Sequence, residues 1–291
     1  MKHLFIIPAI FLMVNYAFPQ QEEIPSITTT QLCKDIYEIT AYGVNLIACA
    51  GDDGMLLTDG GYLETADSLA EKLKELGAAN TYPDILINTH WHFDHTGANK
   101  RFGKNSLIIA HEKTREYLSR DDSLLGGFLP AHPADVLPDF IISDTLQLFY
   151  NGNHIYLIPV KCAHTGSDVM VWFSEKKILH IGDIIFADMF PFVDLEHGGK
   201  PDCLVEVLKQ VISSFPEDTR IIPGHGREYS PEDVKKYINM LETTISIVKT
   251  EKEKGKGLQQ MINENILKDW ESWGVAFSCA DWISFIYNSI E

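Results

Sequence analysis

The sequence predicts an α/β (α+β) fold in which two strand-rich halves are flanked by helices. Short apolar runs alternate with helix-like segments in two stretches, residues 35–115 and 144–225, and such alternation is typical of folds built from packed layers. The turn Asn151-Gly152-Asn153 separates two apolar runs, which predicts a β-hairpin. The length of 291 residues allows one large or two modest domains.

Each predicted strand or helix is an apolar or amphipathic run bounded by turn residues. In the first half we expect strands over residues 36–40, 44–47, 54–60, 83–89 and 106–110, and helices over 65–76 and from residue 96 onward. In the second half we expect strands over 146–150, 155–160, 169–173, 177–179 and 220–222, and helices over 201–214 and 231–250.

The sequence changes character after residue 250. A charged linker, 251–257, leads to an aromatic-rich end in which Trp282, Phe285 and Ile286 have the spacing of an amphipathic helix. We therefore divide the chain into a segment 1–20, a body 30–250 and a C-terminal helical extension 251–291. The apolar face of the extension is expected to dock on the body or against a second copy, so a homodimer is one partner that the sequence allows.

The most informative segment is His90-Trp91-His92-Phe93-Asp94-His95, which holds three imidazoles and a carboxylate. These groups suit zinc and related first-row metals. Alternation along an extended chain places His90, His92 and Asp94 on one side, and His95 turns off the end of the strand. The segment is expected to supply two ligands to one ion and two to a neighbour. The alternative, that all four are ordinary packed or surface side chains, requires them to gather here without a common role.

Three further candidates for metal ligands are His164, Asp183 and His225. Each lies just past a short apolar strand and beside a glycine or another small residue, where the backbone can turn sharply. Each is weak alone, and Asp183 especially so because a Gly-Asp pair is common in turns, but together they complete two sites. Cys162, two residues before His164, is interpreted as a small buried strand residue.

These seven residues, in this order, resemble the ligand set of the metallo-β-lactamase superfamily, and the resemblance extends over residues 36–241. It implies a four-layer αββα metallo-β-lactamase sandwich with the metal site at one edge between the sheets. By similarity the first zinc is held by His90, His92 and His164, the second by Asp94, His95 and His225, and both by Asp183. Iron or manganese are alternative metals. Asp59 matches a carboxylate that orients a ligand imidazole, although a plain turn residue explains it equally well on sequence alone.

The resemblance implies a hydrolase in which a bridging hydroxide attacks a small carbonyl substrate, an ester, lactone, thioester or β-lactam. Two ions about 3.5–4 Å apart lower the pKa of a shared water towards ~7. Asp94 is the candidate catalytic group that relays the proton to the leaving group. An aspartate at position 183 counts against a dedicated antibiotic hydrolase. A flavo-diiron-like redox module and a non-catalytic metal-binding protein remain as alternatives.

Two loops are candidates for the walls of the site, residues 124–133 and 189–194, because loops at strand ends carry specificity on such scaffolds. Phe190 and Phe192 are expected to line an apolar substrate pocket with Trp91 at its rim. The equal alternative is that both phenylalanines cover core. His132 is a candidate anchor for a substrate carboxylate.

The first 20 residues have a basic start, a short apolar run and a polar exit, which is typical of a secretory signal peptide; a buried N-terminal helix is the alternative. The mature protein is then secreted or periplasmic, without a membrane anchor. A net charge of −17 disfavours nucleic-acid partners and leaves a small molecule as the expected substrate. The five scattered cysteines indicate no disulfide framework, and a single disulfide is allowed but cannot be assigned.

Overall fold

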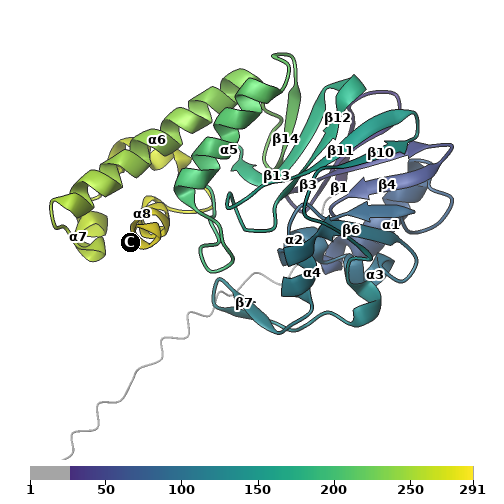
Figure 1. The fold of residues 1–291 in the computed structure, drawn as a ribbon, viewed down its shortest axis with the longest axis horizontal. Coiled ribbons are helices and arrows are strands. Elements are labelled where there is room, and N and C mark those ends of the chain that lie inside the picture. Colours follow the sequence, from purple (N-terminus) through teal and green to yellow (C-terminus); the bar gives the residue numbers. More distant parts are fainter. Residues whose placement is uncertain (1–26, 291) are drawn as a thin grey trace, which may run out of the picture.

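Two sheets packed face to face, with helices on both outer faces, make up the computed structural model, which describes residues 27–290 (Figure 1). The first sheet contains β1 (Ile27–Gln31), β2 (Ile36–Ala41), β3 (Val44–Gly51), β4 (Gly54–Thr58), β5 (Ile85–Ile87), β6 (Leu107–His111) and β9 (Phe140–Ile142). The second contains β10 (Leu146–Tyr150), β11 (Asn153–Pro159), β12 (Val169–Phe173), β13 (Ile178–Phe186) and β14 (Arg220–His225). A separate hairpin consists of β7 (Asp122–Leu124) and β8 (Gly127–Leu129).

The helices lie at the outside of the sheets or at their edges (Figure 1). They are α1 (Ala66–Glu75), α2 (Phe93–Thr96), α3 (Asn99–Phe102), α4 (Glu112–Leu118), α5 (Pro201–Ser214), α6 (Pro231–Glu253), α7 (Leu258–Asn263) and α8 (Cys279–Ser289). Four 3-10 turns are η1 (Leu63–Thr65), η2 (Ala134–Val136), η3 (Ser174–Lys176) and η4 (Lys268–Trp273). Helix α6 begins where it does because Ser230 and Asp233 form a capping box around its first turn.

The two sheets are one hydrogen-bonded path, in the order β10-β11-β12-β13-β14-β3-β4-β5-β6-β9, with β2 beside β3 and β1 beside β2. Within residues 27–290, the strands of the two halves pair with each other only at His225 of β14 and Val44 of β3. Because this junction is so narrow, the path can fold back on itself. The residue at the junction, His225, is one of the predicted metal ligands.

Strand alternation produces three apolar layers. Leu46 and Ile47 are neighbours in β3, and their side chains point to opposite faces. Ile47 lies in the core between the sheets, opposite Leu157 and Val171, whereas Leu46 packs with α1 and α3 on the outside. A third core joins the outer face of the second sheet to α5, α6 and α8. The predicted four-layer αββα sandwich is therefore confirmed.

Several predicted elements match the structure residue for residue, namely β10, β12 and α5. Other predictions are wrong in their extent, two of them by the most. The helix expected from residue 96 is two short helices, α2 and α3, and α2 begins three residues earlier than predicted. The strand expected over 177–179 continues to Phe186 as β13, because all nine of its residues are buried between layers.

The C-terminal segment packs on the body of the same chain. Trp282 and Ile286 of α8 are fully buried in the core that α5 and α6 share. We expected this segment to dock either on the body or against a second copy, and in this structure it docks on the body.

The predicted signal segment, residues 1–20, lies outside the described residues. Among residues 27–290, the helices are all too short or too polar to cross a membrane.

Candidate metal centre

The ligand-rich segment sits in a turn and a helix, which corrects the extended geometry expected for it. β5 ends at Ile87, and His92 is the residue that precedes α2. Asp94 and His95 therefore lie on the first turn of α2, not on a strand. The hydroxyl of Thr96 donates to the carbonyls of Trp91 and His92 (3.2 and 3.0 Å) and fixes this turn. A tight turn that leads into a helix lets neighbouring side chains converge on one place, whereas an extended strand would hold them apart.

The first predicted ligand group converges from three segments. It contains His90, His92, His164 and Asp183, whose potential ligand atoms all lie within 4.8 Å of one another. His92 Nδ1 and His164 Nε2 are 2.9 Å apart. Asp183 Oδ2 lies 3.9 Å from His90 Nε2 and 3.7 Å from His164 Nε2. Asp183 reaches this position from within β13.

The second group shares Asp183 and adds Asp94, His95 and His225. His95 Nε2 lies 3.1 Å from Asp183 Oδ1, and His225 Nε2 lies 3.2 Å from Asp94 Oδ2 and 3.4 Å from Asp183 Oδ2. The two groups are the same as those expected from the family resemblance, with the shared carboxylate of Asp183 between them.

The unpaired polar atoms of the cluster fit metal ions better than an internal hydrogen-bond network. His90 Nε2, His95 Nε2 and Asp183 Oδ1 are buried and make no hydrogen bond, although buried polar atoms are nearly always paired. His95 Nε2 and Asp183 Oδ1 are close, yet both remain without a hydrogen bond. Two groups of imidazole and carboxylate donors that share Asp183 are chemically suited to two divalent ions of the zinc type.

Burial keeps part of the cluster ready to act as neutral ligands. Burial, and then the neighbouring imidazoles, lower the pKa of His90 well below its usual value. Burial and His92 lower the pKa of His164 to about 4. A neutral imidazole presents a lone pair to a metal without first losing a proton.

Gly224 is required for the close approach at Asp183. A Cβ at this position would lie 2.0 Å from Asp183 Oδ1 and 3.0 Å from His95 Cε1. Only glycine leaves room here for β14 to bring His225 beside the shared carboxylate.

Asp59 lies behind the second group, as the resemblance implies. It accepts hydrogen bonds from His95 Nδ1 (2.8 Å) and from the amide and hydroxyl of Thr89 (both 2.7 Å). Its side chain is completely buried. The carboxylate thus turns Nε2 of His95 towards Asp183, which is the usual function of an outer carboxylate beside a ligand histidine.

Asp194 has the same relation to the first group, and sequence reasoning did not identify it. Asp194 Oδ2 accepts from His92 Nε2 (3.0 Å) and from Trp91 Nε1 (3.3 Å), and Asp194 Oδ1 accepts from His197 Nδ1 (2.9 Å). It is 102 residues from His92, so no local pattern in the sequence links the two.

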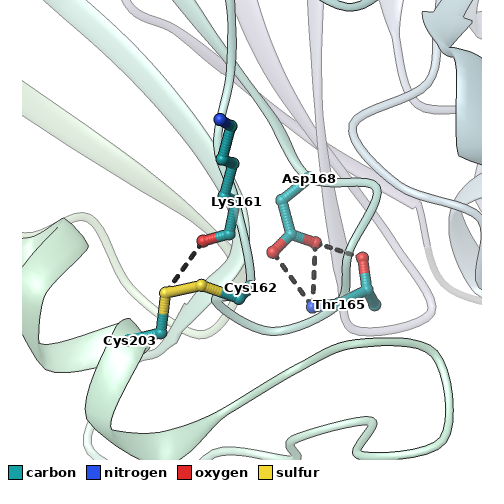
Figure 2. Close-up of a disulfide and its surroundings, with 5 residues drawn as sticks. All are labelled: Lys161, Cys162, Thr165, Asp168 and Cys203. Carbon is teal, nitrogen blue, oxygen red and sulfur yellow. Dashed lines mark hydrogen bonds between the residues drawn. A yellow bond between two sulfur atoms is a disulfide. The ribbon is translucent and has the colours of Figure 1, made fainter.

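A disulfide anchors the loop that carries His164 (Figure 2). Cys162 and Cys203 are bonded across 41 residues and join this loop to the first turn of α5. Cys162 is therefore not the buried strand residue that we predicted: it is half-buried, lies beyond β11 and has a positive φ of 53°. In the same loop the buried carboxylate of Asp168 accepts from the amide and hydroxyl of Thr165 (3.0 and 2.5 Å).

A cavity of ≈ 320 Å³ opens on the second ligand group, and we call it the metal-side cavity. Asp94, Asp183 and His225 line it, and its other walls are mainly the apolar side chains of Leu124, Leu125, Phe186, Met189, Phe192 and Phe277. Lys and Arg are absent from the described residues that line it.

The predicted pocket residues divide between this cavity and other places. Phe192 lines the metal-side cavity. Phe190 does not: it is fully buried and stacks on Trp282 at 6.0 Å between ring centroids. Its prediction as a pocket residue is wrong, because Phe190 packs in the core against Trp282 of α8. Trp91 and His132 line a second cavity, ≈ 190 Å³, next to the first.

Comparison with known proteins gives three consistent results. The sequence model of the metallo-beta-lactamase superfamily matches residues 40–245. A hydroxyacylglutathione hydrolase of Synechococcus sp. is 28% identical over 174 residues, which are 58% of this chain and 58% of that protein. A probable metallo-hydrolase of Bacillus subtilis is 26% identical over 181 residues, 61% of this chain and 82% of that one. A metallo-beta-lactamase structure from Pontibacter korlensis superposes with a TM-score of 0.59 at 15% identity, covering 75% of this chain and 99% of that one.

Proposed function

The chain belongs to the metallo-β-lactamase superfamily, and from that membership we propose that this metal-dependent hydrolase uses two zinc ions to hydrolyse neutral esters, thioesters or lactones that carry an apolar group. The observation that carries the proposal is the pair of ligand groups sharing Asp183 beside an apolar cavity. Iron or manganese in the same positions would be compatible with the donor set.

The lining of the metal-side cavity supports the choice of substrate. A β-lactam antibiotic or a glutathione thioester brings carboxylates, which are commonly bound by basic side chains. The described residues lining this cavity include no lysine or arginine, and Asp94 and Asp183 already contribute negative charge. An uncharged substrate with an apolar group next to its carbonyl matches these walls better. The hydroxyacylglutathione hydrolase of Synechococcus sp. is matched over only 58% of its length, so its substrate is not assigned to this chain.

Bound ions would supply Lewis acidity and an acidified water as nucleophile, and the protein side chains would control geometry and proton movement. Asp94 is the side chain placed for the proton. Its carboxylate lines the metal-side cavity and is 14% exposed, whereas Asp183 is 3% exposed. Asp94 can therefore accept a proton from the nucleophile and return it to the leaving group. Asp59 and Asp194 hold His95 and His92 in the orientation that the ions need.

Export from the cytoplasm is part of the proposal. The Cys162–Cys203 disulfide supports it, because disulfides persist mainly in oxidising compartments.

The first experiment combines metal analysis of the purified protein with a substrate panel: a neutral aryl ester, a thioester, an acyl lactone, a chromogenic cephalosporin and a phosphodiester. About two zinc ions per chain and turnover of the neutral carbonyl substrates are expected. Two iron ions with redox activity would favour a diiron function, and bound metal without any hydrolysis would indicate a binding protein.

Variants test the site itself. H92A and D94A should each lower kcat/KM by at least about 10²-fold, since each removes a ligand and D94A also removes the proton acceptor. D67N is the matched control, because Asp67 is an 89% exposed surface partner of Arg101. Full turnover in D94A would contradict the proposed mechanism.

A further inference from the structure

We propose that the reaction centre has separate pockets for the two sides of the scissile bond, and that the substrate is an open-chain ester or thioester with an apolar group on each side of its carbonyl. This inference rests on the proposed function and deepens it. The metal-side cavity holds one group. The second cavity, which we call the aromatic cavity, holds the other.

The aromatic cavity is built from the ligand-bearing segment. Trp91 and Phe93 alternate with the predicted ligands His90, His92 and Asp94, and both line this cavity. Its lining also includes Tyr62, Tyr117, Leu118 and Leu129, together with polar residues such as His132. Its volume of ≈ 190 Å³ exceeds the roughly 150 Å³ of an apolar cavity that accommodates benzene. An aryl or branched alkyl group fits this space.

A single ridge separates the two cavities. Tyr62 and Phe93 line both of them, and their rings lie 5.8 Å apart between centroids. Phe93 is 43% exposed, so this ridge is the rim of the site and not a closed wall. Tyr62 lines the metal-side cavity together with Asp94 and Asp183, so the ridge borders the second ligand group. A substrate carbonyl at the ions can therefore extend one substituent over the ridge.

The charges around the aromatic cavity suit a neutral group. Lys100 and Arg120 are balanced by Glu64 and Asp122, and Arg120 is already paired with Asp122 (3.1 Å). The cavity therefore offers an incoming group apolar contact without net charge.

Two cavities on opposite sides of a ridge favour an open-chain substrate. In an ester or thioester the acyl and leaving groups point away from each other on the two sides of the carbonyl. In a lactone or lactam the two sides are tied together in one small ring, so the ring itself occupies one pocket and reaches the other only through substituents. The proposed function allows lactones, and the two-pocket arrangement narrows it to open-chain substrates.

The test fills each cavity separately. L129W places an indole in the aromatic cavity, since Leu129 lines that one only, and A276W does the same in the metal-side cavity. The adjacent residues Phe128 and Val275 are 69% and 70% exposed and line neither. F128W and V275W are therefore matched controls for adding an indole at each place. Melting temperature and bound metal are measured for all four variants, so that a folding defect is recognised.

Each zinc-loaded variant is assayed on a grid of esters in which acyl and alcohol groups range independently from methyl to benzyl. L129W should lower kcat/KM for benzyl esters relative to methyl esters by about tenfold or more. This loss should appear when the group is varied on one side of the carbonyl and not on the other. A276W should cause the same loss on the other side, and the controls should keep the wild-type profile. The proposal is overturned if L129W discriminates no better than F128W, or if both filling variants act on the same side.

Failure of the proposed function would be recognised separately, because the wild-type protein would then hydrolyse no member of the grid. In that case calorimetric binding of dibenzyl ketone, an unreactive analogue with both groups, decides the question. Weaker binding in L129W and in A276W would support two pockets, and equal binding in all variants would refute them.

Discussion

Two buried carboxylates, Asp59 and Asp194, set the orientation of the predicted ligands from outside the cluster. Each accepts a hydrogen bond from the ring nitrogen of a ligand histidine that faces away from the centre. Because one ring nitrogen donates to the carboxylate, the other ring nitrogen points towards the cluster. The precision of the site therefore depends on residues that touch no substrate.

D194N tests this positioning effect. An amide holds His92 less firmly than a carboxylate, and loss of such an outer partner typically weakens metal affinity or activity about 10–100-fold. Zinc dissociation measured with a chromophoric chelator, together with kcat/KM, is the readout. E196Q, an exposed change two residues away, is the control. Unchanged zinc affinity in D194N would argue against a positioning role.

His197 predicts a pH dependence of stability. Burial alone lowers its pKa, but the carboxylates of Asp194 and Asp122 outweigh burial and raise it above 6.5. Because the folded state binds this proton more tightly than the unfolded state, the stabilisation is complete below pH 6.5 and is lost as the pH rises through the raised value. The urea unfolding free energy of H197Q should therefore fall further below wild type at pH 6 than at pH 9.

D122N removes one of the two carboxylate partners of His197. The unfolding free energy of D122N should also fall further below that of wild type at pH 6 than at pH 9, but by less than for H197Q. If the unfolding free energies of wild type and H197Q differed more at pH 9 than at pH 6, the predicted direction of the pH dependence would be wrong.

At the level of elements, the site depends on loops that join the ends of strands. The loop between β11 and β12 carries His164, and the segment between β13 and α5 carries Asp194. The amide of Lys200, at the end of the second segment, donates to the carbonyls of Cys162 and Ala163 (3.0 and 3.1 Å), and the disulfide joins the first loop to α5 directly after that segment. Loss of this connection should affect both stability and the first ligand group.

The double variant C162S/C203S tests this connection. A cross-link over 41 residues stabilises a fold by about 4 kcal/mol on a chain-entropy estimate. We expect a lower melting temperature and faster loss of one metal ion, because His164 lies two residues from Cys162. C279S, at a free and half-buried cysteine, is the control. If C162S/C203S melted at the same temperature as C279S, the disulfide would not stabilise the fold.

On the scale of the whole molecule, the C-terminal segment belongs both to the core and to the site. Trp282 donates from Nε1 to the hydroxyl of Thr244 in α6 (2.8 Å) and stacks on Phe190. Phe277, which precedes α8, lies against Phe192 at 5.5 Å between ring centroids and lines the metal-side cavity. Docking of the tail therefore shapes the metal-side cavity.

W282A should destabilise the protein by about 3–5 kcal/mol, the usual loss for a fully buried aromatic residue. Chemical denaturation measures the loss, and V275A, at a 70% exposed position of the same segment, is the control. A second readout is the profile of ester sizes, which should broaden as the tail loosens. A loss no greater than that of V275A would mean that the tail does not stabilise the fold.

The sequence by itself determined many of the strands and helices and the identity of the groups that converge. β10, β12 and α5 were predictable because each is a regular apolar pattern between turn residues, and regular patterns are local. The seven clustered side chains were predictable because the chemistry of imidazole and carboxylate is independent of the fold. Their division into two groups was implied by the family resemblance and is found in the structure.

Only the tertiary structure decided how these residues meet. The path from His90 to His95 is a turn and a helix instead of an extended strand, because backbone carbonyls there are satisfied by Thr96 and by α2. The partnership of Asp194 with His92 and the bond between Cys162 and Cys203 join residues far apart in the chain. Phe190 lies in the core because Trp282 of the distant helix α8 stacks on it. Each of these depends on which distant segments pack together, and a local pattern carries no information about that choice.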